Sequence, residues 1–172
     1  MWCCSYTDGE GLWHTEKYSE EMFFYHWFVM ASRYLDNPMV IGADLRNELR
    51  GYIDTETNET VPATWGFGLH ETDWKVAAEE AGRTVLEANP NMLVIVEGIA
   101  SGGDLTAATA APVLLPYQER LVYSAHMYTN SPVVPEMPYP LFEETMFLMQ
   151  TFVTVPGHEY SAGFWFGNST VF

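Results

Sequence analysis

A short apolar run that ends in an amide and a carboxylate constrains the fold of this chain more than any other stretch. Pro38 and Gly51 bracket it, and residues 39–43 supply the small and β-branched side chains of a strand buried on both faces. Asn47 and Glu48 follow within a few residues. In an α/β barrel, the C-terminal ends of such strands carry the active-site groups.

Two interpretations of Glu48 follow from this stretch. A carboxylate delivered by a rigid strand, beside an amide and near aromatic residues, suits the general acid that protonates a glycosidic oxygen. Alternatively, Glu48 caps a loop or pairs with Arg46 or Arg50.

The next region predicts a strand, loop, helix and strand with a parallel crossover over residues 40–97. Residues 72–88 predict a helix capped by Thr72, and residues 92–96 predict a second buried strand that ends in Glu97. Glu97 is either a structural acid at the mouth of the barrel or a member of the catalytic pair. One face of the helix is apolar: Trp74, Ala77, Ala78, Ala81, Val85 and Leu86.

Two further elements are predicted on either side of this unit. Residues 19–34 predict a helix with Ser19 as its N-cap and acidic residues in its first turn. His26 lies inside its apolar run, which indicates a core or interface residue rather than a ligand. Residues 121–128 predict a third strand that carries His126 near its end.

The composition favours a neutral polymer as partner. Seven Lys and Arg stand against 23 Asp and Glu, a net charge of −16, which argues against nucleic acids and anionic membranes. The aromatic share of 15% suits stacking on sugar rings. The chain has 172 residues, enough for one domain but short of the about 250 of a complete barrel.

Signals for other classes of protein are weak. We expect no signal peptide in this chain, no membrane-spanning run, no cofactor and no metal site, because the five His are scattered. Cys3 and Cys4 are adjacent and poorly placed to bond each other, and their pairing stays open.

Several separated motifs, in order, resemble glycoside hydrolase family 5, the cellulase family. The resemblance implies an incomplete catalytic domain over residues 1–172, a partial (β/α)8 TIM barrel from roughly the end of strand 3 through strand 7. The matching motifs are Asn37-Pro38, Val40–Gly42, Asp44-Leu45, Asn47-Glu48, Asp73-Trp74, Asn89–Asn91, Val96–Gly98, Arg120–His126 with Tyr128, and Trp165–Gly167.

The resemblance also implies roles for single residues. Glu48 takes the place of the catalytic acid/base, and Asn47 that of the residue that binds the sugar 2-hydroxyl. A simple pleat points these two side chains to opposite faces, so the strand end must twist or bulge. His126 and Tyr128 would orient the nucleophile and contact sugar.

Residues 1–17 would form the loop after the third strand, where Trp2 and Trp13 would either line a sugar subsite or pack on the barrel rim.

The chain departs from the family pattern at two positions. Leu49 follows Glu48 where the family usually has Pro, and Asn168 stands where the family has its nucleophilic Glu. A retaining glycosidase needs two carboxyl groups about 5–5.5 Å apart, and Asn is a poor nucleophile. We therefore expect the isolated chain to be inactive.

Three functions remain open on the sequence. The family implies an endo-β-glucanase that hydrolyses β-glucans by a retaining mechanism and is secreted in its full-length form. The alternatives are a non-catalytic carbohydrate-binding remnant and a non-functional fragment that does not fold alone.

Overall fold

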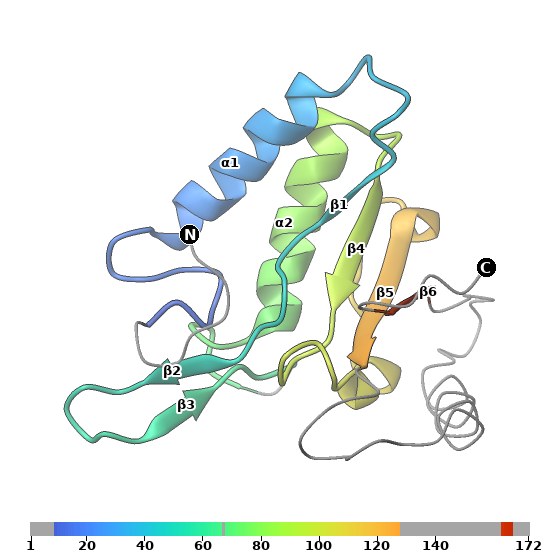
Figure 1. Ribbon diagram of the computed structural model, residues 1–172. Coiled ribbons are helices and arrows are strands. Elements are labelled where there is room, and N and C mark those ends of the chain that lie inside the picture. The colour runs from blue at the N-terminus through green and yellow to red at the C-terminus, as the bar shows by residue number, and fades with distance from the viewer. Residues whose placement is uncertain (1–8, 67, 128–162, 167–172) are drawn as a thin grey trace.

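The computed structural model describes residues 9–66 and 68–127 together with the backbone of residues 163–166. In these ranges the chain forms two α-helices, six strands and two short 3-10 turns (Figure 1). Their bounds are α1 Glu20–Arg33, β1 Gly42–Asp44, β2 Gly51–Ile53, β3 Thr60–Pro62, α2 Trp74–Ala88, β4 Leu93–Glu97, η1 Thr106–Thr109, η2 Gln118–Arg120, β5 Leu121–Met127 and β6 Gly163–Phe166.

Four parallel strands make the main sheet, in the order β1-β4-β5-β6. Ala43 on β1 lies opposite Val94 on β4, and Val96 lies opposite Tyr123 on β5. Parallel neighbours need a crossover connection, and α2 supplies it between β1 and β4. The predicted crossover over residues 40–97 is confirmed.

Helix α1 lies beside α2, and α2 packs next to β4 (Figure 1). The predicted start of α1 is confirmed, because Ser19 is its N-cap and its side chain accepts a hydrogen bond from the Met22 amide. His26 is exposed, so of the two predicted alternatives the core position is wrong, while a position at an interface stays a prediction. The reason is that α1 touches its neighbours along one narrow stripe, and Ala31 is its buried residue.

The core lies between α2 and the sheet. All six residues of the predicted apolar face of α2 are buried, which confirms that face. Val94 and Val96 of β4 are fully buried as well. Alanine side chains on α2 let the helix approach closely, and a Cβ added at Gly82 would lie 2.7 Å from Leu115 Cδ2.

Strand β1 differs from its prediction. The sequence predicts a strand buried on both faces over residues 39–43, but β1 begins only at Gly42. Met39 is 85% exposed and Ile41 is 70% exposed. Among the described residues β4 alone pairs with β1, so solvent reaches the apolar side chains that lead into it.

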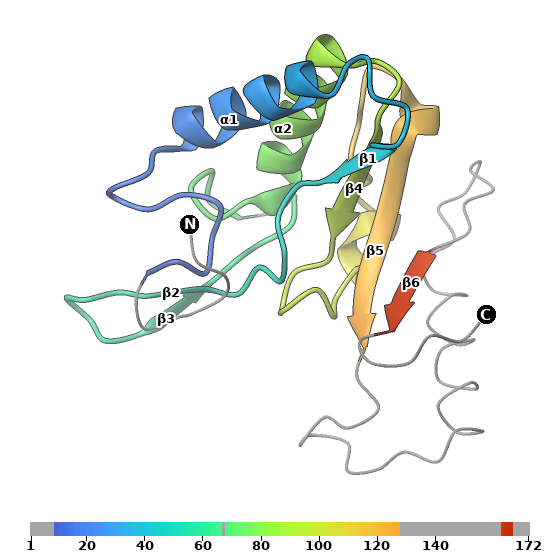
Figure 2. The same cartoon turned by 45° about the horizontal axis from the view of Figure 1, so that its top comes forward.

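The polar stretch after Glu48 holds an antiparallel hairpin of β2 and β3. Figure 2 shows this hairpin at the end of the molecule toward which the β4 and β5 arrows point. Gly51 at its base has φ +121°, and a Cβ there would lie 2.2 Å from the Val61 carbonyl oxygen. Only glycine fits both the conformation and the space.

Trp74 ties α2 to the end of β4, because its buried indole Nε1 donates a hydrogen bond to the Glu97 carbonyl at 2.9 Å. We expect Trp74→Phe to lower the free energy of unfolding by about 2 kcal/mol, through a lost donor and a small cavity. Urea denaturation measures the loss. The matched control is Trp27→Phe, because Trp27 also donates to a carbonyl, that of Leu45, but is only half-buried. An equal loss of unfolding free energy in the two variants would contradict the stabilising role of the buried Trp74 hydrogen bond.

Candidate active site

The carboxylate of Glu48 lies where three strand ends meet. Its Oε1 is 3.0 Å from His126 Nδ1 on β5, and its Oε2 is 3.0 Å from Arg50 Nη2. Its main-chain amide donates to Oε2 of Glu97, at the end of β4, at 2.8 Å. Residues that are 78 positions apart in the chain thus share one hydrogen bond. The arrangement fixes the carboxylate of Glu48 from two sides.

The backbone at Glu48 is distorted, as the resemblance predicts for this strand end. Glu48 has φ +47°, in the left-handed region that costs a residue with a side chain about 1–2 kcal/mol. The contacts on either side hold it there. The following residue, Leu49, is fully buried, and its carbonyl accepts a hydrogen bond from Ser101 at 2.7 Å. The strain is therefore held in place by the core beneath the site.

Both arginines near Glu48 have defined partners. Arg50 pairs with Glu48, which agrees with one of the alternatives for Glu48. Arg46 does not pair with Glu48. Its buried guanidinium instead donates to the carbonyls of Leu12, Glu10 and Asn47, and burial lowers its pKa. Arg46 thus fastens the loop before α1 to the end of β1, a role that the sequence alone did not suggest.

Glu97 is the most enclosed acid of the cluster, with 1% of its surface exposed. Its Oε1 lies 3.1 Å from His126 Nε2, and its carboxyl group is hydrogen-bonded to that of Asp44. Burial raises the pKa of Glu97 to about 7; the hydrogen bond from the Glu48 amide opposes this rise, and the charge of Asp44 adds to it. Enclosure on this scale favours the structural interpretation of Glu97 over membership of a catalytic pair.

Asp44 and His126 complete the cluster. Asp44 closes β1 with its side chain open to solvent, and desolvation by the neighbouring groups raises its pKa while the hydrogen bond to Glu97 lowers it. Since water reaches Asp44, we take Glu97 as the member of the pair that carries the proton. The His126 amide donates to the Gly102 carbonyl at 2.9 Å, which holds the imidazole between Glu48 and Glu97.

The other predicted site residues fall into two groups. Asn47 is exposed beside Glu48. Trp2, Tyr128 and Asn168 lie outside the described residues, so their predicted roles stay predictions.

Trp13 does not line a subsite. Its ring is fully buried, stacks against Trp74 at 5.6 Å between centroids, and donates from Nε1 to Glu20 Oε1 at 2.8 Å. A buried ring has no free face for a sugar, so the subsite role for Trp13 is wrong and the packing alternative holds.

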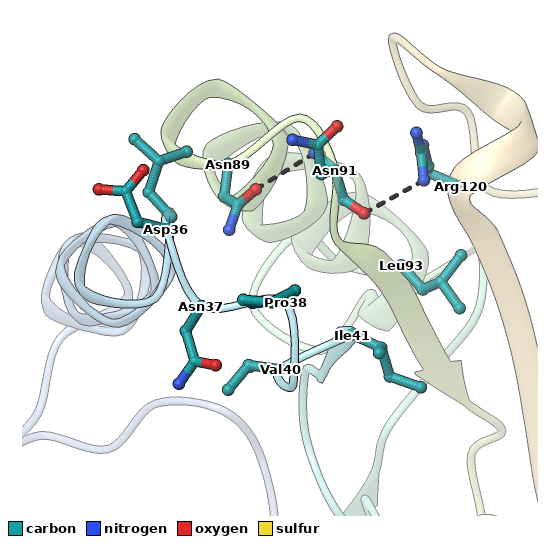
Figure 3. A pocket seen from close by; sticks show the side chains of 10 residues that line it. Asp36, Asn37, Pro38, Val40, Ile41, Asn89, Asn91, Leu93 and Arg120 are labelled. Atoms are coloured by element: carbon teal, nitrogen blue, oxygen red, sulfur yellow. Dashed lines mark hydrogen bonds between the residues drawn. The ribbon is translucent and has the colours of Figure 1, made fainter.

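A cavity of about 660 Å³ lies at the other end of the strands (Figure 3). Its lining residues precede β1, β4 and β5 or begin them, among them Val40, Asn91 and Arg120. Arg120 donates to the Asn91 carbonyl at 3.1 Å, as Figure 3 shows. The cavity is thus separate from the cluster of acids, and it holds no pair of carboxyl groups.

Comparison with known proteins identifies the fold of this site. The model of the family described as cellulase (glycosyl hydrolase family 5) matches residues 6–140. The chain belongs to glycosyl hydrolase family 5. An endoglucanase of Paenibacillus polymyxa is 40% identical over 139 residues, which are 74% of this chain and 32% of that protein. The major extracellular endoglucanase of Xanthomonas campestris pv. campestris is 34% identical over 129 residues, covering 68% of this chain and 24% of that protein.

Solved structures give the same result for the fold. The family 5 chain matches an endocellulase from Pyrococcus horikoshii, solved as a variant complex with cellotetraose, with a TM-score of 0.65 and 33% identity. The match covers 91% of this chain and 48% of that one. The expected partial (β/α)8 barrel is confirmed, with β1, β4, β5 and β6 as neighbouring parallel strands. The chain spans about a third or less of the curated relatives given above.

The described residues contain no helix long and apolar enough to cross a bilayer. Neither do they contain a group of three or more His, Cys, Asp or Glu arranged to hold a metal ion.

The raised pKa of Glu97 predicts a pH-dependent stability. Folding raises this pKa from 4.5 to about 7, so the folded state binds the proton more tightly. The stabilisation from the neutral acid is present below pH 4.5 and is lost as the pH rises to about 7, an effect of at most about 3 kcal/mol.

Urea denaturation between pH 4 and 8 tests this prediction in wild type, Glu97→Gln and the surface control Glu87→Gln. We expect Glu97→Gln to gain stability relative to wild type across this interval, and Glu87→Gln to follow wild type. Parallel curves for all three proteins would contradict the raised pKa.

Proposed function

We propose that this chain carries the acid/base side of an endo-β-glucanase site of the retaining type, with Glu48 as the acid/base. The observation that supports this most is the fixed carboxylate of Glu48 at the C-terminal ends of parallel strands. Unlike Glu97, Glu48 keeps part of its side chain, 12%, open to solvent. A carboxyl group held in this way can approach a glycosidic oxygen and transfer a proton to it.

The neighbours of Glu48 have roles of their own in this proposal. Arg50 and His126 hold its two oxygens, so that the carboxylate keeps one orientation while a sugar binds. Asn47, exposed beside it, would bind the 2-hydroxyl of the sugar. Preorganised groups of this kind lower the entropy cost of reaching the transition state.

The proposed substrate is a β-1,4-linked glucan, for which two observations give support. Relatives of this chain are described as endoglucanases, and an endocellulase of similar fold was solved with cellotetraose. The net charge of −16 does not repel a neutral polymer. We further propose a secreted full-length form, because one relative is described as extracellular.

Hydrolysis by a retaining mechanism requires a nucleophilic carboxylate as well as the acid/base. By the resemblance of Trp165–Gly167 to the family motif, Asn168 would stand at the position of the attacking carboxylate, and an amide cannot form the glycosyl–enzyme intermediate of a retaining enzyme. We therefore propose that the chain as it stands binds cello-oligosaccharides without cleaving them. This is the second candidate function, and Asn168 is the observation that favours it.

Hydrolysis of cellotetraose tests the catalytic assignment. We expect no turnover by the wild-type chain, and measurable turnover by Asn168→Glu, because that substitution supplies the second carboxyl group. Adding Glu48→Gln to Asn168→Glu should lower kcat/KM by about 10²–10⁴-fold, the usual contribution of a general acid. Turnover by the wild-type chain that Glu48→Gln leaves unchanged would contradict the assignment.

Titration calorimetry with cellotetraose tests the binding function. We expect saturable binding by wild type, and binding weakened at least about tenfold by Asn47→Ala, through the lost hydrogen bonds to sugar. Asn58→Ala, an exposed Asn in the β2–β3 turn, is the matched control and should bind as wild type does. Absence of binding by a chain with a cooperative unfolding transition would contradict the binding function, and absence of any cooperative transition would support the third alternative, a non-functional fragment that does not fold alone.

A further inference from the structure

The two-carboxylate mechanism leaves two acids of the site without a role. Glu97 is buried at the end of β4, and Asp44 closes β1 next to it. Burial of a carboxyl group costs free energy unless hydrogen bonds satisfy it. The pairing register explains why the two acids meet, since Asp44 lies opposite Ile95, two residues before Glu97 on the adjacent strand. A buried acid that costs folding free energy in this way suggests a specific role for its carboxyl group.

Each oxygen of Glu97 contacts a different part of the proposed acid/base machinery. Oε2 accepts the Glu48 amide at 2.8 Å, and Oε1 lies 3.1 Å from Nε2 of His126. The other ring nitrogen of His126, Nδ1, contacts the Glu48 carboxylate at 3.0 Å. Glu97 therefore reaches Glu48 twice, once through the main chain and once through the imidazole.

The surroundings of Glu97 are closed on the remaining side. Gly102 has φ +77°, and a Cβ there would lie 3.0 Å from Glu97 Oε2 and 3.1 Å from His126 Cγ. The indole of Trp74 bonds the Glu97 carbonyl from beneath. The carboxyl group thus has little freedom to rotate, and its hydrogen bonds keep a fixed direction.

We propose that Glu97 is a positioning residue for Glu48: its carboxyl group, hydrogen-bonded to Asp44, holds the left-handed Glu48 backbone and sets the hydrogen bonding of the His126 ring. The proposal rests on the proposed role of Glu48 as acid/base. Glu97 does not touch substrate, and it acts through the two residues that contact it.

The proton on Glu97 links this role to pH. When Glu97 is neutral, it donates to Asp44 and His126 faces one carboxylate, that of Glu48. When Glu97 is ionised, the imidazole lies between two carboxylates, those of Glu48 and Glu97. The titratable and charged groups of the described chain that face this cluster are Asp44, Arg46, Glu48, Arg50 and His126.

Carbon-13 NMR of the full chain, labelled at the Asp and Glu carboxyl groups, together with nitrogen-15 NMR of His126, tests the proposal between pH 4 and 9. We expect one carboxyl group that titrates near pH 7 in wild type. It should vanish in Glu97→Gln and titrate at lower pH in Asp44→Asn, which removes a neighbouring negative charge. In both variants the His126 ring shifts should follow a changed pH profile, while the control Glu87→Gln keeps that of wild type.

Hydrogen exchange at the Glu48 amide tests the hydrogen bond from this amide to Glu97, separately from the effect of the proton on Glu97. Gln at position 97 still offers an oxygen to this amide, so protection should survive in Glu97→Gln. Glu97→Leu removes the acceptor, and exchange should become about tenfold faster. If the leucine variant does not fold, the glutamine and Asp44→Asn variants still decide.

The proposal is overturned if the His126 pH profiles of Glu97→Gln and Asp44→Asn superimpose on that of wild type. Glu97 would then be a buried acid without influence on the machinery around it. None of these readouts needs hydrolysis or sugar binding. If the chain fails the cellotetraose tests but shows the expected NMR and hydrogen-exchange results, the proposed function is refuted and the positioning role of Glu97 is not.

Discussion

The parallel pairing of β1, β4 and β5 is the constraint on which the site depends. It brings the C-terminal ends of three segments to one edge of the sheet, where Glu48, Glu97 and His126 meet. Slipping the register by one residue would turn each of these side chains to the opposite face. The buried face of α2 packs on β4, where Val94 lies against Gly82, and a slip of one residue would turn Val94 away from the helix.

The site carries costs that the core offsets. A left-handed Glu48 and a buried Glu97 each oppose folding by on the order of 1–3 kcal/mol. Fully burying one Val or Leu side chain contributes about 1.5–3 kcal/mol in return. Val94 and Val96 of β4, the strand that ends in Glu97, are completely buried, and so is Leu49 next to Glu48. The strained part of the molecule therefore adjoins fully buried side chains, which help to position the carboxylate.

The molecule has two unlike ends. At the C-terminal ends of the strands, acids, an imidazole and two guanidinium groups gather within hydrogen-bonding distance of one another or of the main chain. At the other end, the cavity of Figure 3 is lined largely by apolar and amide side chains. Chemistry that needs a proton donor suits the first end, where the carboxyl groups of Glu48 and Glu97 and the imidazole of His126 lie together.

Much of the fold could be predicted from local patterns in the sequence. The Ser19 cap, the apolar face of α2 and the parallel crossover follow from short-range rules of capping and periodicity. The motif around Glu48 pointed to the family and to the partial barrel. Strand ends that carry polar residues also predicted where the site lies.

Contacts between distant segments were decided by the tertiary structure alone. In the sequence, Trp13 is an aromatic residue in a predicted loop. Only its burial and its packing on Trp74 show that no sugar can reach its ring. Met39 and Ile41 have the side chains of a buried strand, yet their exposure depends on which segments cover them. The role of Glu97 was open for the same reason. Its burial and its contacts with Glu48 and His126 come from three strands, and no local rule of sequence specifies how three strands meet.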